Sequence, residues 1–370
     1  MQAFDAAHPV ERRRELWGRD EQLELLFDGV LYQRKHAIVH GTRGSGKTSL
    51  VRVFADYADR QGAVLIYLAC DAHTHFAGLM RPFIRFVPST NIPNGRERAF
   101  RMQVDALGDD FGPRALVSLL VELAPKPIIF ILDEFDRVTD RGVQDAVATT
   151  MKLLSDAKAP VQLLVVGIAQ SVAELIEHHP SLRRHMVAVP VRQIPDSEIA
   201  KLIDDGALRA RISFDRAASG LLAQAACGSP YHARLFAYHA GLLGLQQGDG
   251  QVTRSIASAG LARAAGEWGQ MNDTDYEIFK RLTASSPDVQ AKLIETAALA
   301  AREQWVTPAR LNGSGDAALE LLAPAMEGDA TKVRFRDSLA PQFLIAMLLA
   351  GEAEGAIVRR QPAAIQEQSQ

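Results

Sequence analysis

The sequence is poor in cysteine and has no long uninterrupted apolar run. Its 370 residues include only Cys70 and Cys227, too few for a disulfide framework or a four-cysteine zinc site. The most apolar stretch, 338–351, is too short to span a bilayer and contains Pro341. The first ten residues lack the apolar core of a signal peptide. These absences predict a cytoplasmic protein that does not enter the membrane.

The sequence also lacks an excess of charge of either sign. Lys and Arg number 41 against 44 Asp and Glu, a formal net charge of -3, so the chain as a whole is not a polycation that coats nucleic acid. Any contact with DNA must therefore be local. Hydrophobic residues make up 47% and charged residues 23%, which is typical of globular proteins and excludes disorder as the main state. The length predicts two or three domains.

The first half of the chain alternates apolar, β-branched runs with helical patterns, which is typical of a parallel sheet covered by helices on both faces. The runs have no strict polar alternation, as expected for strands buried on both sides. The predicted fold is therefore a doubly wound, five-stranded parallel α/β core. The five predicted strands are 37–40, 63–69, 128–132, 161–166 and 186–191.

The strand signal ends near Pro195, and helical patterns follow. In the last hundred residues a helix at 288–302, a short helix at 316–322 and a hairpin at 326–335 come in the order of a winged helix. The predicted domains are an α/β core at 15–194, a helical lid at 195–245, a linker at 246–270, a winged-helix domain at 271–360 and a disordered tail at 361–370.

The most specific motif is a GxxxxGK[ST] phosphate loop directly after the strand 37–40 and directly before a helical run. Its glycines let backbone N–H groups point at phosphate oxygens, and the start of the following helix adds positive potential. Lys47 is expected to reach the β- and γ-phosphates, and Thr48 to hold Mg²⁺. The predicted nucleotide-binding residues of the loop are Gly41, Thr42, Arg43, Gly44, Ser45, Gly46, Lys47, Thr48 and Ser49.

Two carboxylates follow the apolar strand 128–132, at the edge of the sheet where α/β proteins bind ligands. Asp133 is expected to position Mg²⁺, directly or through water. Glu134 is expected to act as the general base that polarises the attacking water. A phosphate loop and an acidic strand end together predict a nucleotide with a γ-phosphate as the ligand and cleavage of this phosphate by water as the reaction.

These motifs, with the helical lid that follows them, resemble the AAA+ ATPases. More narrowly, the chain is similar to the origin-recognition and helicase-loader initiators and to the related STAND signalling ATPases. Trp17-Gly18-Arg19-Asp20-Glu21 is similar to the Gly-Arg-acid box of both groups, so the resemblance implies that Gly18 and Arg19 lie against the adenine. The predicted winged helix completes the arrangement, and the resemblance covers nearly the whole chain.

The resemblance implies three further site positions. Gln170, after the fourth predicted strand, would be the first sensor of the γ-phosphate, where many relatives have Asn. Arg183 or Arg184 would be the finger that completes a neighbouring subunit's site. Tyr231 stands where initiators have the second sensor arginine, and Arg234, near the same helix face, would substitute for it. The start Gly228-Ser229-Pro230 is closer to the STAND pattern.

The resemblance leaves two functional hypotheses open. The first is an initiator-like switch ATPase that couples its nucleotide state, ATP or ADP, to oligomerisation and to DNA or a partner. The second is a STAND-like signalling switch that acts through protein contacts without DNA. Residues 270–370 carry 10 Lys and Arg against 14 Asp and Glu, the wrong sign for strong DNA binding. The segment 81–101, with five Arg and one Glu among phenylalanines, suits a nucleic-acid or subunit contact or is an amphipathic insertion with its phenylalanines in the core.

Overall fold

The chain folds into two compact units, each of which is assembled from segments that are separated in the sequence. The computed structural model describes residues 1–72, 75–167, 180–248, 250–307, 310, 315–329 and 331–359. The sheet unit comprises Pro9–Gly41 and Gly46–Val191, and the helical unit comprises Met1–His8, Thr42–Ser45 and Arg192–Gln370. Four residues of the predicted phosphate loop therefore group with the C-terminal half of the chain.

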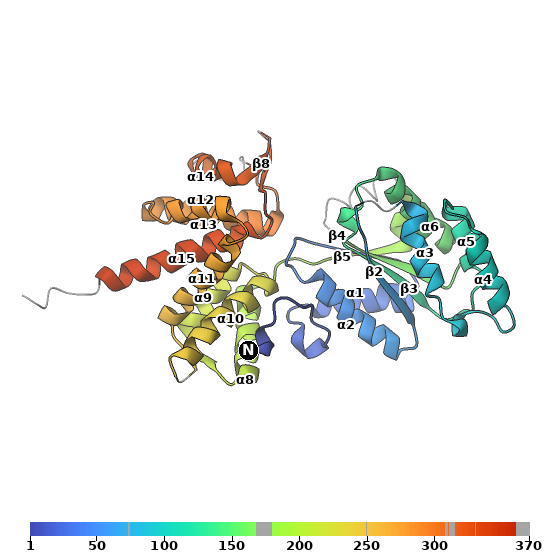
Figure 1. The fold of residues 1–370 in the computed structure, drawn as a ribbon, viewed down its shortest axis with the longest axis horizontal. Coiled ribbons are helices and arrows are strands. Elements are labelled where there is room, and N and C mark those ends of the chain that lie inside the picture. Colours follow the sequence, from blue (N-terminus) through green and yellow to red (C-terminus); the bar gives the residue numbers. More distant parts are fainter. Residues whose placement is uncertain are drawn as a thin grey trace, which may run out of the picture. The chain divides into compact units, whose positions relative to one another are not determined.

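The sheet unit contains a five-stranded parallel sheet in the order β2-β3-β4-β1-β5 (Figure 1). This confirms the predicted fold class. Strand β4 lies between β1 and β3, so the strand before the phosphate loop and the strand before the two carboxylates are not neighbours. The strands are β1 His36–His40, β2 Val64–Ala69, β3 Ile128–Asp133, β4 Val161–Gly167 and β5 Met186–Pro190.

Helices cover both faces of this sheet (Figure 1). Strand β3 shows why its sequence is apolar throughout: Ile128, Phe130 and Leu132 pack into the core on one face, and Ile129 and Ile131 into the core on the other. Helices α1 Asp20–Leu26 and α2 Lys47–Arg60 cover the second face. The first face is covered by α3 Phe76–Arg85, α4 Glu97–Ala106, α5 Pro113–Leu120 and α6 Arg141–Asp156.

The helical unit is built from helices that follow one another along the chain, with a short parallel β6–β7 pair and a β8–β9 hairpin. Its aromatic centre stacks Trp268 on Phe279 and on Phe343, with ring centroids 5.6 and 4.9 Å apart. The elements are α8 Asp196–Ala210, β6 Ser213–Phe214, α9 Arg216–Ala226, α10 Pro230–Gln246, β7 Gln251–Val252, α11 Arg254–Gly269, α12 Asp273–Leu282, α13 Pro287–Glu303, α14 Gly315–Leu322, β8 Met326–Gly328, β9 Val333–Phe335 and α15 Ala340–Arg359.

The predicted division of this C-terminal part into lid, linker and winged helix stays a prediction. The predicted linker contains α11, a regular helix that packs against α9, α10 and α15. Helices α13 and α14 and the β8–β9 hairpin follow one another in the predicted order. The predicted disordered tail, 361–370, lies outside the described residues. None of the helices in the described part of the chain is long and apolar enough to cross a membrane.

A buried histidine joins two strands of the sheet to a helix. The His36 Nδ1 accepts from the backbone N–H of Leu163 at 2.8 Å, and its Nε2–H donates to the Met151 carbonyl at 2.7 Å. One ring therefore satisfies a strand donor and a helix acceptor. Burial, with a smaller contribution from nearby His185, lowers the pKa of His36 to about 4 and keeps the ring neutral.

We expect His36 to make the sheet unit sensitive to acid. The folded pKa lies below the ordinary value of 6.5. The stability that neutral His36 contributes is therefore complete above pH 6.5 and is lost as the pH falls toward 4. Between pH 7.5 and 5 this loss is about 2 kcal/mol. His36→Ala should lower the free energy of unfolding by about 2–4 kcal/mol at pH 7.5 and reduce its pH dependence, as measured by urea unfolding.

The matched control is His8→Ala, because the His8 side chain is 81% exposed. It should leave the urea midpoint at pH 7.5 nearly unchanged. A His36→Ala variant with the same pH dependence as the parent protein would contradict the assignment.

Candidate functional site

The loop between β1 and α2 depends on glycines in the left-handed region. Gly44 has φ +75° and Gly46, the residue before the first turn of α2, has φ +91°. Residues other than glycine rarely adopt this backbone conformation. The Ser45 N–H donates to the Thr42 carbonyl at 3.3 Å, which closes a tight turn, and the Lys47 ammonium donates to the Gly41 carbonyl at 3.0 Å. The loop therefore brings its lysine back over its own backbone.

The carboxylate of Asp133 is held by donors from three elements. The Thr48 hydroxyl, at the start of α2, donates to Asp133 Oδ2 at 2.9 Å, and the Tyr67 hydroxyl of β2 donates to the same oxygen. The backbone N–H of Glu134 donates to Oδ1 at 2.8 Å. Asp133 is only 4% exposed. Thr48 and Asp133, the two predicted metal ligands, are thus brought together.

Tyr67 is a site residue that the sequence analysis missed. Burial, followed by the hydrogen bond to Asp133 and the charge of this carboxylate, raises the pKa of the phenol. The Arg52 guanidinium lies over its ring, 5.2 Å from the centroid. The available signal was weak: Tyr67 carries the only hydroxyl in the apolar strand β2.

Glu134, the predicted general base, occupies a left-handed backbone position. Its φ is +55°, which is uncommon for a residue with a side chain, and it precedes the short 3₁₀ helix Phe135–Arg137. Its carboxylate accepts from the Arg137 Nε at 2.9 Å and is 47% exposed. Glu134 therefore follows Asp133 at the strand end but is paired to an arginine on its own turn.

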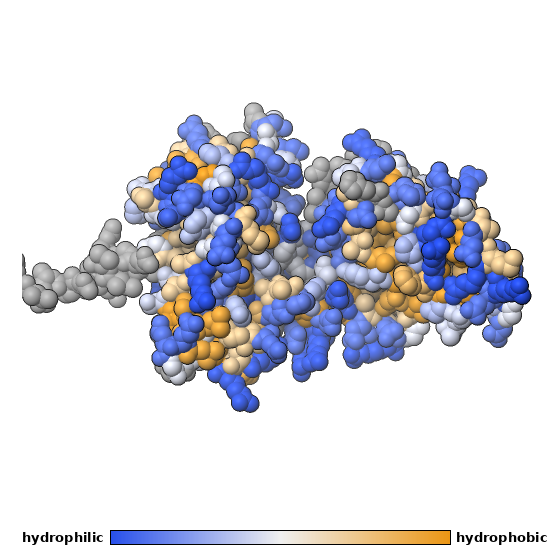
Figure 2. Space-filling model, viewed as in Figure 1, coloured by the Kyte–Doolittle hydropathy of each residue, from blue (hydrophilic) through white to orange (hydrophobic). Residues whose placement is uncertain are grey.

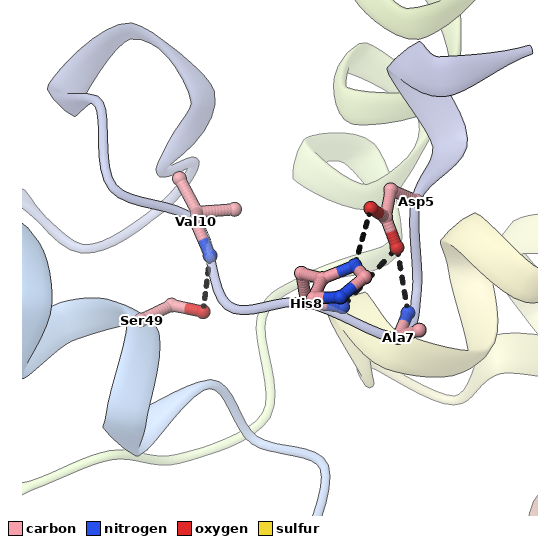
Figure 3. Close-up of polar contacts among 5 residues, drawn as sticks. All are labelled: Asp5, Ala7, His8, Val10 and Ser49. Atoms are coloured by element: carbon pink, nitrogen blue, oxygen red, sulfur yellow. Dashed lines mark hydrogen bonds and ion pairs between the residues drawn. The ribbon is translucent and has the colours of Figure 1, made fainter.

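The first turn of α2 also binds the N-terminal segment of the sheet unit. The Ser49 hydroxyl accepts from the backbone N–H of Val10 at 3.0 Å (Figure 3). Within the helical unit, the carboxylate of Asp5 accepts from the Ala7 N–H at 2.8 Å and from the His8 ring at 2.8 Å (Figure 3). Ser49, predicted to bind nucleotide, uses its side chain to hold the chain that leads into the Gly18–Arg19 box.

The Gly18–Arg19 box lies just before α1. Gly18 has φ +61°, and Arg19 is only 3% exposed. Burial lowers the pKa of Arg19 to about 10, so its guanidinium stays charged at neutral pH. The neighbouring Trp17 Nε1–H is buried and has no hydrogen-bond partner among the described residues. An unpaired buried donor of this kind is the feature a hydrogen-bonding ligand would satisfy.

The remaining predicted site residues lie on separate elements. Arg183 and Arg184 are both exposed on the 3₁₀ helix Pro180–His185, which leads into β5. Arg234 is half-buried on α10. Gln170, the predicted first sensor, lies outside the described residues.

Two side chains of the helical unit donate hydrogen bonds to the residues at the tip of the phosphate loop, which belong to the same unit. The Ser229 hydroxyl donates to the Gly44 carbonyl at 3.2 Å, and the Gln193 amide donates to the Thr42 hydroxyl at 2.9 Å. Ser45 is only 1% exposed, whereas Arg43 is exposed. The sequence analysis missed Gln193 and did not assign Ser229 a contact.

Basic side chains of the C-terminal elements are partly engaged within the protein. In the C-terminal elements Arg334 pairs with Glu327 at 2.6 Å and Arg336 pairs with Asp275 at 2.8 Å. Lys332 and Arg334 also lie over the Trp305 ring, 4.6 and 4.8 Å from its centroid. These contacts neutralise part of the charge that a phosphate backbone would need.

In the arginine-rich segment, Phe83 and Phe100 are buried, whereas Phe86 is 63% exposed. Arg101 donates to the Val87 carbonyl at 2.7 Å, and Arg96 pairs with Glu122 at 3.2 Å. Hydrophilic residues cover much of the visible surface over α4 and α5 (Figure 2). Phe83 and Phe100 therefore face the core, whereas Phe86 lies on the outer side.

Comparisons with known proteins agree with this geometry. The family model described as AAA ATPase domain matches residues 10–166. A Walker-type ATPase of Pyrococcus abyssi has a similar fold, with a TM-score of 0.52 and 16% identity, over 92% of this chain and 99% of its own. Cdc6p of Pyrobaculum aerophilum has a TM-score of 0.52 and 15% identity, over 95% of this chain and 98% of its own.

The ORC2 protein of Aeropyrum pernix, solved as ADPNP–ADP complexes, has a TM-score of 0.51 and 16% identity, over 96% of this chain and 98% of its own. No curated protein is significantly similar in sequence. At these identities the solved structures show a shared fold. The matched segment spans the phosphate loop, both carboxylates and the sheet up to β4. Residues 10–166 are therefore similar to an AAA ATPase domain.

Proposed function

We propose that this protein binds ATP with Mg²⁺ and hydrolyses it to ADP and phosphate. The observation that carries the proposal is the 2.9 Å hydrogen bond between Thr48, at the end of the phosphate loop, and Asp133, at the end of β3. A hydroxyl and a carboxylate are hard oxygen ligands, the type that Mg²⁺ prefers beside nucleotide phosphates. The donor set therefore fits a magnesium nucleotide.

The phosphate loop provides binding and orientation. Its backbone N–H groups and the start of α2 would hold the phosphates, and Lys47 would neutralise the charge between the β- and γ-phosphates. Thr48 and Asp133 would hold the metal, which when bound polarises the phosphate oxygens. The fixed orientation of Asp133, with donors on both oxygens, reduces the rearrangement that binding requires.

Glu134 is proposed as the general base that takes the proton of the attacking water. To reach a water near the γ-phosphate its carboxylate would exchange its partner Arg137 for this water. Gln170 would contact the γ-phosphate as the first sensor. Gly18 and Arg19 would lie against the adenine.

We further propose an initiator-like switch, in which the nucleotide state controls self-association and contact with DNA or a protein partner. Arg183 and Arg184 are exposed, as a finger that enters a neighbouring subunit's site must be. The similar fold of archaeal Cdc6p and ORC2 supports this class of switch. Arg234 is kept as the proposed second sensor on α10.

A STAND-like signalling switch without DNA binding is the second candidate. The observation that favours it is the pairing of Arg334 and Arg336 with Glu327 and Asp275 in the C-terminal elements. Cations that are already paired within a domain gain less from phosphate contacts.

We expect Glu134→Gln to lower the rate of ATP hydrolysis about 10²- to 10⁴-fold, because an amide cannot accept the proton of the attacking water. ATP affinity should change less than about threefold, since no contact to the phosphates is removed. Phosphate release and equilibrium ATP binding measure the two effects. Glu24→Gln, an exposed substitution on α1, is the matched control. Undiminished turnover in Glu134→Gln would remove Glu134 from the mechanism.

Replacement of Thr48 should separate metal binding from nucleotide binding. Thr48→Ala removes the hydroxyl that bonds to Asp133, so the Mg²⁺ concentration for half-maximal ATPase activity should rise about tenfold or more. Thr48→Ser keeps the hydroxyl and should behave like the parent protein. If both variants have the parental Mg²⁺ dependence, Thr48 is not a metal ligand.

Electrophoretic shift with duplex DNA at low and moderate salt, with ATP or ADP, should distinguish the two switches. The initiator-like switch predicts a shift that depends on the nucleotide and weakens with salt. Lys332→Glu should weaken a contact made by the C-terminal hairpin, and Arg98→Glu one made by the arginine-rich segment. No shift with either nucleotide would favour the signalling switch.

A further inference from the structure

The start of helix α10 carries a hydrogen-bond relay that ends on the phosphate loop. The Ser229 hydroxyl lies 3.2 Å from the Gly44 carbonyl oxygen and 2.9 Å from Nδ1 of His232. Ser229 is 1% exposed, and His232 is fully buried. All three residues belong to the helical unit. A buried relay of this kind fixes each member, because its polar groups cannot form hydrogen bonds with water instead.

The direction of the relay follows from the groups themselves. A carbonyl oxygen only accepts, so the Ser229 hydroxyl donates to Gly44. In the tautomer that carries its proton on Nδ1, the His232 ring donates to the Ser229 oxygen. Burial lowers the pKa of His232 to about 3, so the ring is neutral and holds one proton.

The orientation of one peptide group in the loop depends on this contact. The peptide unit between Gly44 and Ser45 is planar and trans, so its C=O and N–H point in opposite directions. With the carbonyl held by Ser229, the Ser45 N–H points back into the loop, where it donates to the Thr42 carbonyl. A phosphate oxygen is an acceptor that could take the place of this carbonyl.

The local sequence explains the close approach. A Cβ on Gly44 would lie 3.1 Å from Ser229 Oγ, and the φ of Gly44 is +75°. A Cβ on Gly228 would lie 2.7 Å from the Ile194 carbonyl oxygen, so glycine is needed for α10 to start beside the chain segment that holds Gln193. Gln193 then donates to Thr42, a second contact to the loop tip. The Gly228-Ser229 pair thus places its hydroxyl through close backbone packing.

His232 is itself held by aromatic rings from two helices. The rings of Phe236 on α10 and Phe343 on α15 lie 5.7 and 5.1 Å from it. Phe343 in turn stacks on Trp268 of α11. The packing of these aromatic rings therefore fixes the position of the His232 ring, and through it the position of the Ser229 hydroxyl.

From these contacts, and resting on the proposed binding of ATP, we propose that Ser229 and His232 are positioning residues. They orient the Gly44–Ser45 peptide so that the loop presents an N–H group to the nucleotide phosphates. Ser229 acts on the loop through a hydrogen bond between neutral groups, and His232 acts through Ser229.

The test is calorimetric titration of Ser229→Ala and His232→Phe with ATP, ADP and adenosine. Each variant removes one link of the relay, so affinity for ATP and ADP should fall about five- to tenfold, the effect of one lost hydrogen bond. Affinity for adenosine should not change, because adenosine has no phosphate. His232→Asn restores a donor near Nδ1 and should recover part of the affinity.

Two controls separate positioning from stability. Ser229 also caps α10, since its oxygen accepts from the His232 N–H at 3.4 Å, so Ser229→Ala should lower the thermal midpoint. Thr253→Ala removes the same type of cap from α11 and should lower the midpoint without changing nucleotide affinity. His232→Phe leaves the cap in place and keeps the aromatic packing, so it stays informative if Ser229→Ala does not fold.

The outcomes are distinguishable. If the parent protein binds ATP, and the folded His232→Phe variant binds ATP and ADP as tightly as the parent protein does, the positioning role is wrong and the proposed function stands. An equal loss for adenosine would also overturn it, because the defect would then not lie at the phosphates. A parent protein that binds no ATP would refute both proposals.

Discussion

The hydrogen bond between Thr48 and Asp133 joins two strand ends that are not adjacent in the sheet. Thr48 follows β1 and Asp133 ends β3, with β4 between them. The bond therefore exists only if all three strands keep their register, which the apolar side chains on both faces provide. Tyr67 extends the same network to β2. The chemistry proposed for the site thus depends on the packing of nearly the whole sheet.

The elements of the sheet were largely predictable because each is encoded locally. The predicted strand 128–132 lies within β3 Ile128–Asp133, and Gly46, a glycine that the phosphate-loop motif specifies, takes the left-handed backbone. The meeting of Thr48 with Asp133 followed from a general property of parallel sheets, whose carboxyl ends lie on one edge. Periodicity and motif spacing were sufficient for these features.

Contacts between distant parts of the chain were not predictable in the same way. Tyr67 lies in an apolar strand, and nothing in its neighbours indicates that its hydroxyl reaches Asp133. Ser229 reads as an ordinary helix cap, and the 185 residues that separate it from Gly44 carry no signal of their contact. Glu134 was predictable as an acid at a strand end, but its pairing with Arg137 depends on the backbone of the turn. Such contacts arise from tertiary packing, which a single sequence does not encode in any local pattern.

The grouping of Thr42–Ser45 with the helical unit has a consequence for dissecting the protein. A chain cut after Val191 would keep every residue of the phosphate loop and both carboxylates, yet it would lack the Gln193 amide and the Ser229 hydroxyl that bind the loop tip. The reverse fragment would keep these donors without their acceptors. A cut between β5 and α8 therefore separates these two donors from the loop groups that accept from them.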